Sequence, residues 1–96
     1  MKQYLITAKD FTDENALERR LKARPLHFEN ARRLKLTGNF ISGGAVLDEH
    51  DKMIGSMMVL QFDSESEVDK WKESEPYLTM KVWENIDIRP FKLADV

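Results

Sequence analysis

Four short runs of the chain have the residue pattern of β-strands. They cover residues 3–9, 39–48, 54–62 and 82–91. The first and third carry apolar residues on both alternating sets, which is typical of strands without one fully solvated face. The polar residues 49–53 have the length of a hairpin loop. The pattern therefore predicts a β-hairpin flanked along the chain by two further strands.

The segment between the first two strands has helical spacing. Thr12 or Asp13 can cap its first turn, and Leu17 and Leu21, one turn apart, are expected to be its inward contacts. The helical pattern ends at Gly38, which is placed as a left-handed cap. We expect one or two helical pieces here.

Pro25 interrupts this segment, in the sequence Arg24-Pro25-Leu26-His27. Because proline has no backbone N–H and its φ is already helical, we interpret it as a helix start or a bend. Ala31 and Leu34 follow His27 at i+4 and i+7, which places His27 on the inward stripe. A histidine on that stripe, one turn from Arg24, calls for a chemical explanation.

A second helix is predicted after residue 63. Ser64 and Glu67 have the spacing of a capping box. Glu75 precedes Pro76 and is pushed toward extended geometry, so the helix should end by residue 75. Within the second strand, Gly43 and Gly44 mark a bulge or a close approach of another backbone or a ligand.

The predicted element order is βαββαβ, that of a ferredoxin-like α+β domain. Two helices would cover one face of a four-stranded antiparallel sheet, and residues 1–96 would form one domain. The other face would stay open although the third strand is apolar on both sides. A second copy of the sheet is the simplest cover, so we expect a homodimer.

Composition narrows the classes of function. The chain has 15 basic and 17 acidic residues, a net charge of −2 and no cysteine. The balanced charge argues against a nucleic-acid partner, and the lack of cysteine excludes disulfides and thiolate catalysis. No apolar run has the length of a membrane span and no secretory leader is visible, so we expect no membrane partner and a cytoplasmic location.

The chain resembles the YciI-like family, small proteins of the dimeric α+β barrel superfamily. The motifs that carry the resemblance are Lys9-Asp10, Arg24-Pro25-Leu26-His27, Gly43-Gly44-Ala45, Leu47-Asp48, Gly55-Ser56, Glu75-Pro76-Tyr77 and Ile88-Arg89-Pro90-Phe91. The resemblance implies an active site centred on a histidine, here His27, with a nearby aspartate, and activity on small organic molecules. Where the family commonly has Asp-Pro-Tyr, this chain has Glu75-Pro76-Tyr77.

His27 would then be a general acid or base that a carboxylate holds in one tautomer. Asp10 and Glu75 are the two candidates for that carboxylate. We rank Asp10 first, because Glu75 is one methylene longer than the family's aspartate. The other interpretation of His27 is a core histidine bonded to a neighbouring carbonyl.

Four residues are candidates for substrate binding: Arg24, Gly44, Ser56 and Tyr77. Arg24 could bind an anionic group, although a surface pair with Glu18 or Glu29 is the commoner fate of such a residue. Ser56 could donate to a ligand or only serve turn chemistry. We predict neither a metal site nor a cofactor.

Three hypotheses follow from these residues. The first is an enzyme in which His27 transfers a proton on a small polar substrate, in a lyase, isomerase or hydrolytic step. The second is a non-catalytic dimeric module that binds a metabolite or a protein. RNA binding on the open sheet face ranks last, because the central strands lack exposed aromatic and basic residues.

Overall fold

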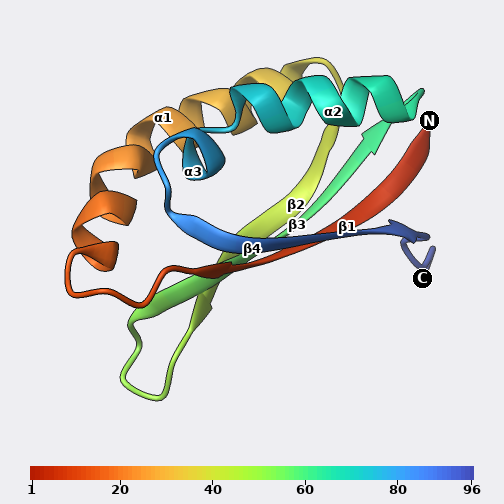
Figure 1. Ribbon diagram of the computed structural model, residues 1–96. Coiled ribbons are helices and arrows are strands. Elements are labelled where there is room, and N and C mark those ends of the chain that lie inside the picture. Colours follow the sequence, from red (N-terminus) through yellow and green to blue (C-terminus); the bar gives the residue numbers. More distant parts are fainter.

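Four antiparallel strands form one sheet in the order β2-β3-β1-β4 (Figure 1). The computed structural model describes residues 1–96. The strands are β1 (Lys2–Asp10), β2 (Phe40–Leu47), β3 (Met53–Phe62) and β4 (Trp83–Phe91). Two central strands of this sheet, β1 and β3, pair with each other and each with one edge strand. The predicted ferredoxin-like α+β fold is confirmed.

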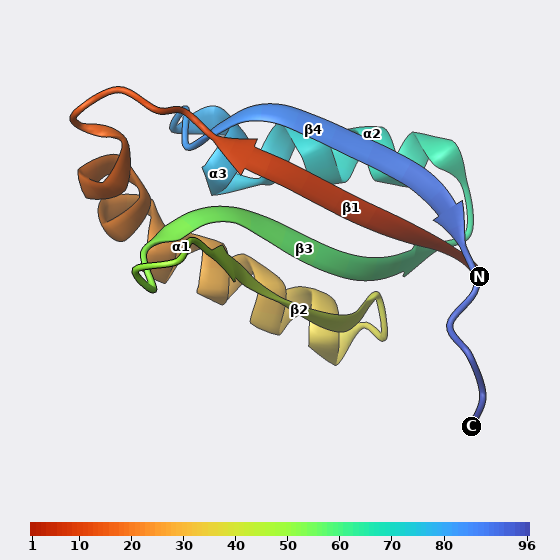
Figure 2. The ribbon, with the colours of Figure 1, turned by 90° about the horizontal axis from the view of Figure 1, so that it is seen from below.

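All three helices lie on one face of the sheet, and the opposite face is open (Figure 2). They are α1 (Ala16–Leu36), α2 (Glu65–Ser74) and α3 (Pro76–Thr79). The short α3 follows α2 directly, with Pro76 at its first position, where the missing N–H costs nothing. None of the helices is long and apolar enough to cross a membrane.

The core fills the space between the sheet and the helices. Side chains alternate along β1, so that Tyr4, Ile6 and Ala8 point toward the helices and the odd-numbered residues point to the open face. The buried apolar cluster is completed by Ala23, Met58, Leu60, Phe62, Val68, Trp71, Tyr77, Val82 and Trp83.

The inward face of α1 differs from the predicted one. Its buried residues are Ala16, Arg20, Ala23, His27 and Asn30. Leu17 and Leu21, the expected inward contacts, are 39% and 51% exposed. The true stripe is offset by one position from these two leucines and contains three polar side chains, so the prediction for Leu17 and Leu21 was wrong, whereas the predicted inward position of His27 is confirmed.

Helix α1 passes through Pro25 without a break. The interpretation of Pro25 as a helix start is therefore wrong, whereas a bend agrees with the curved course of α1 in Figure 1. Pro25 is exposed, so the ring does not disturb the packed side. The helix ends where predicted, with Gly38 at a φ of +78°.

Two other local predictions are corrected. Helix α2 begins after Ser64 as expected, but the Ser64 side chain makes no capping bond and its Oγ lies 3.0 Å from the Oγ of Ser66. The irregularities in β2 fall between Phe40 and Ser42 and between Val46 and Leu47, so Gly43 and Gly44 do not form a bulge. Gly43 nevertheless lies close to β3, because a Cβ there would be 3.0 Å from the Met57 carbonyl oxygen.

Candidate active site

A cavity of about 180 Å³ lies between α1 and the β2–β3 side of the sheet. It is lined by Arg20, Arg24, His27, Phe28, Ala31, Phe40, Gly43, Gly44, Ala45, Ser56, Met58 and Tyr77. The inward stripe of α1 contributes Arg20 and His27, polar residues where a globular protein usually places leucine or isoleucine, and Arg24 lines the cavity from an exposed position of the same helix. The cavity follows from the small and polar residues on this stripe.

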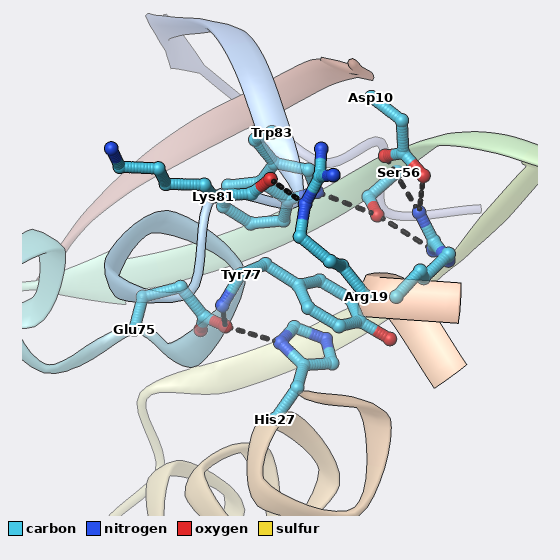
Figure 3. Close-up of polar contacts among 9 residues, drawn as sticks. Asp10, Arg19, His27, Ser56, Glu75, Tyr77, Lys81 and Trp83 are labelled. Atoms are coloured by element: carbon cyan, nitrogen blue, oxygen red, sulfur yellow. Dashed lines mark hydrogen bonds and ion pairs between the residues drawn. The ribbon is translucent and has the colours of Figure 1, made fainter. Parts of the chain in front are cut away.

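His27 is held by Glu75 at one side of this cavity. Its Nδ1 lies 2.5 Å from Glu75 Oε1 (Figure 3), and both residues are buried, with exposed fractions of 8% and 1%. The same Oε1 accepts the backbone N–H of Tyr77 at 3.1 Å and so caps α3. A carboxylate on Nδ1 favours the tautomer that leaves the Nε2 lone pair free.

Asp10 is not the partner of His27. Both of its carboxylate oxygens accept from Nη1 of Arg20, at 2.9 and 3.0 Å. The prediction that Asp10 rather than Glu75 is the partner of His27 is therefore wrong, because Asp10 is bound to the buried guanidinium of Arg20. Burial raises the pKa of Asp10, and the contact with Arg20 acts in the opposite direction and lowers it.

Ser56 connects this ion pair to the sheet core. Its Oγ accepts from Arg20 Nη2 at 2.9 Å and from the indole N–H of Trp83 at 3.1 Å. Ser56 is 2% exposed and lines the cavity, and its own O–H has no acceptor among the hydrogen bonds of the structure. Its oxygen is committed to the scaffold, which leaves only its proton for a ligand.

Tyr77 forms the surface against which His27 rests. The two rings are stacked, with centroids 3.9 Å apart and planes inclined by 10°. The Arg20 guanidinium lies 4.8 Å from the Tyr77 ring centroid. Burial raises the pKa of Tyr77; the charges of Arg20 and Arg24 lower it, and those of Glu75 and Asp10 raise it.

Arg24 and Gly44 also line the cavity. The Arg24 guanidinium lies 4.8 Å from the ring centroid of Phe28 and forms no salt bridge. The surface pair with Glu18 or Glu29 is absent, and Glu29 lies 3.6 Å from Arg33 instead. Gly44 has no side chain and lines the cavity with its backbone. A Cβ added there would meet no atom within 4 Å.

Arg20 is the site residue that the sequence analysis missed. It precedes His27 by seven positions, and Ala23 lies between them at the i+3 position of the same stripe. The helical spacing of Arg20, Ala23 and His27 in the sequence indicates that all three lie on one face of the helix. It was hidden because Pro25 suggested that the helix was broken between these residues, and because arginine on a buried stripe is rare without a partner.

The family follows from the whole sequence. Residues 2–92 match the YCII-related domain. The chain belongs to this family. Protein YciI of Escherichia coli and that of Shigella flexneri are each 30% identical to it over 95 residues, covering 93% of this chain and 95% of the relative. The predicted resemblance to YciI-like proteins is confirmed.

Solved structures share the fold of this YCII-related chain. The 5-chloro-2-hydroxyhydroquinone dehydrochlorinase of Burkholderia phenoliruptrix, in complex with 2,5-dihydroxybenzoquinone, has a TM-score of 0.81, 22% identity and coverage of 96% of this chain and 95% of its own. A dimeric ferredoxin-like protein of unknown function from Jannaschia has a TM-score of 0.58, 9% identity and coverage of 97% and 100%. At these identities the likeness concerns the fold alone.

Proposed function

We propose that this protein is a small acid–base enzyme in which His27 transfers a proton on a small organic substrate bound in the α1–sheet cavity. The observation that carries the proposal is the buried contact between His27 Nδ1 and Glu75. It fixes the ring and its tautomer while His27 lines the cavity and Nε2 has no partner in the protein. This is the arrangement that a general base needs.

The chemistry begins with removal of a proton from an acidic C–H or O–H of the substrate by Nε2. The electron pair stays on the substrate as an enolate or a phenolate, and His27 becomes a cation that Glu75 stabilises. Return of the proton to another carbon completes an isomerisation, while departure of a leaving group completes an elimination. The dehydrochlorinase that shares the fold makes elimination the first reaction class to test.

Proton transfer can be measured before the natural substrate is known. We expect the protein to exchange acidic C–H protons for deuterium in D₂O in at least one member of a panel of hydroxyquinones, hydroquinones and 1,3-dicarbonyl acids. Loss of the C–H signal is followed by NMR. Because His27→Gln removes the base while leaving a side chain of similar size, it should reduce the exchange rate at least about 100-fold.

His50→Gln is the matched control. His50 is exposed in the loop between β2 and β3, so the same substitution there should leave the exchange rate unchanged. Equal rates for the wild type and His27→Gln would contradict the proposal. Binding of panel members without any exchange or turnover would favour the alternative, a non-catalytic module that binds a metabolite or a protein.

We also propose that the protein acts as a homodimer through the open sheet face. Leu5 and Val59 pair across β1 and β3 on that face, where Val59 is 3% exposed, and Thr7 pairs next with Met57, which is 38% exposed. An apolar patch at the centre of an uncovered sheet suits a two-fold contact, and two of the neighbours that share the fold are described as dimeric.

Sedimentation equilibrium tests this assembly. Met57→Lys places a charge at the centre of the open face and should convert the dimer to a monomer. Leu36→Lys is the control, because Leu36 is 88% exposed at the end of α1, a helix on the opposite side of the sheet from the open face. A dimer that is unaffected by Met57→Lys, or a monomeric wild type, would exclude the open face as the contact.

A further inference from the structure

We propose that Arg20 and Arg24 form a binding subsite for an anionic oxygen, and that the ligand of the cavity is a planar ring that carries a carboxylate or another ionised oxygen. This inference deepens the proposed function by naming the class of ligand. It rests on the N–H groups of Arg20, on the charges of the cavity wall and on the shape of that wall.

Arg20 has unused donors although it is almost completely buried. Nη1 bonds to both oxygens of Asp10, and Nη2 bonds to Ser56. Nε has no partner and is inaccessible in the free protein. A guanidinium carries five N–H groups, and these contacts use two of them, since one Nη1–H points between the two oxygens of Asp10 and one Nη2–H reaches Ser56. The Nε–H and one Nη2–H lie along the edge of the plane that binds carboxylates in a bidentate manner.

Burying a donor without a partner is costly, so the unpaired and buried Nε–H of a residue that lines the cavity needs an explanation. A ligand oxygen would supply the missing acceptor. Asp10 and Ser56 hold the guanidinium from its other side, and the Tyr77 ring lies against it at 4.8 Å. The arginine is therefore fixed before any ligand arrives, which reduces the entropy lost on binding.

The charges of the cavity wall favour an anion. The lining residues include Arg20 and Arg24 and no carboxylate. Asp10 and Glu75, the nearest acids, contact Arg20 and His27 and lie outside the lining. Arg24 has no salt-bridge partner, and it lines the same cavity as Arg20.

The shape of the cavity favours a flat molecule. The sheet side includes the β2 segment Gly43-Gly44-Ala45, which has almost no side-chain atoms, beside Phe40 and Met58, and α1 contributes His27 and Phe28. Backbone on one side and aromatic rings on the other leave a slot for a planar group. A volume of about 180 Å³ suits a single ring with its substituents.

Benzoate and benzamide are suitable probes, because they have nearly the same shape and differ in charge. Binding is measured by chemical-shift changes in ¹⁵N-labelled protein, with the amides of Gly43 and Gly44 as local reporters. We expect benzoate to bind at least about tenfold more tightly than benzamide, since hydrogen bonds to a charged group are the stronger ones. Cyclohexanecarboxylate, which has the charge but no planar ring, should bind more weakly than benzoate.

Three variants assign the effect to residues. Arg24→Gln should weaken benzoate binding about tenfold and leave benzamide binding unchanged. Arg20→Lys keeps a cation beside Asp10 but lacks the bidentate edge, so it should remove most of the preference for benzoate. Arg33→Gln is the control, because Arg33 is an exposed arginine of the same helix that does not line the cavity.

Equal affinities for benzoate and benzamide in the wild type would overturn the proposal. The proposal would also be overturned if Arg24→Gln and a folded Arg20→Lys variant both kept the wild-type preference for benzoate over benzamide. If Arg20→Lys does not fold, Arg24→Gln still decides the outcome. Because binding alone is measured, charge-dependent binding without proton exchange would support this subsite and contradict the enzymatic proposal, so the two fail separately.

Discussion

His27 lies flat on Tyr77, with ring centroids 3.9 Å apart, and Tyr77 is only two residues from Glu75, which accepts from the His27 Nδ1. One short segment around α3 therefore fixes the histidine in two directions. Glu75 sets the rotation of the ring within its plane, and Tyr77 sets the plane itself. A catalytic histidine needs both constraints, because a free ring would present Nε2 to the cavity only part of the time.

The tautomer of His27 is the first prediction. In its neutral form we expect the proton on Nδ1 and the lone pair on Nε2, because Glu75 accepts at Nδ1. Nitrogen-15 chemical shifts of the labelled ring measure this directly. His50, which is exposed, should show the mixture of tautomers typical of a solvated histidine, and Glu75→Gln should move His27 toward that mixture.

Glu75→Asp should separate the two tasks of Glu75. An aspartate still caps α3 but is one methylene too short to reach His27 without a shift of the backbone. We expect the free energy of unfolding to fall by about 1–2 kcal/mol for Glu75→Asp, and by more for Glu75→Ala, which loses the cap as well. Urea denaturation measures both. A Glu75→Asp variant with an unshifted His27 tautomer would contradict this division.

Two glycine substitutions should have opposite outcomes. A Cβ at Gly55 would lie 2.5 Å from the backbone oxygen of Ala8, whereas a Cβ at Gly44 would have no neighbour within 4 Å. Because β1 and β3 cannot separate without losing the sheet register, we expect Gly55→Ala to destabilise the fold by about 1–3 kcal/mol. Gly44→Ala should change stability by less than about 0.5 kcal/mol. Thermal denaturation of the two variants, side by side, tests this contrast.

Acid stability should depend on Asp13. Its carboxylate accepts two hydrogen bonds from Arg19, at 2.7 and 2.8 Å, and this contact lowers the pKa of Asp13 from 3.8 to about 2. Because the pKa is lower in the folded state, the stabilisation is present above pH 3.8 and is lost as the pH falls from there toward about 2.

The measurement is the free energy of unfolding of Asp13→Asn and the wild type between pH 6 and pH 2. The difference between the two should be largest at the upper end and should shrink as the pH falls. Asp69→Asn, an exposed aspartate of α2 without an ion pair, serves as the control and should show no such trend. A difference that stays constant over this range would mean that the Asp13–Arg19 pair does not contribute through ionisation.

The sequence predicts the strands well and the contents of α1 poorly, for physical reasons. Strand runs such as 54–62 carry their own pattern, and the βαββαβ order then leaves few ways to form a sheet. On α1 the apolar period points to Leu17 and Leu21, but the helix packs over a cavity, so the residues that line the cavity decide its orientation. The spacing of apolar residues predicts an inward face that is apolar, so it does not reveal that Arg20 and Asn30 lie on the buried face of α1.

The choice between Asp10 and Glu75 could not be made from spacing. Glu75 lies 48 positions from His27, and only the folded chain reveals which carboxylate reaches the ring. Arg20 explains why Asp10 is not the partner of His27. A buried guanidinium needs an acidic partner, and Asp10, the last residue of β1, supplies it. Its longer side chain made Glu75 the less favoured candidate for the partner of His27, yet that side chain reaches both His27 and the amide of Tyr77.

The cavity under α1 has a consequence for hydrogen exchange. A helix that rests on Arg20, His27 and Asn30 over a hollow space lacks the dense apolar contact that usually protects backbone amides, so its middle turns should open more readily than the central strands. A molecule that fills the space would slow this opening. Deuterium uptake along α1 therefore offers a way to search a collection of compounds for the physiological ligand, without knowing what reaction, if any, it undergoes.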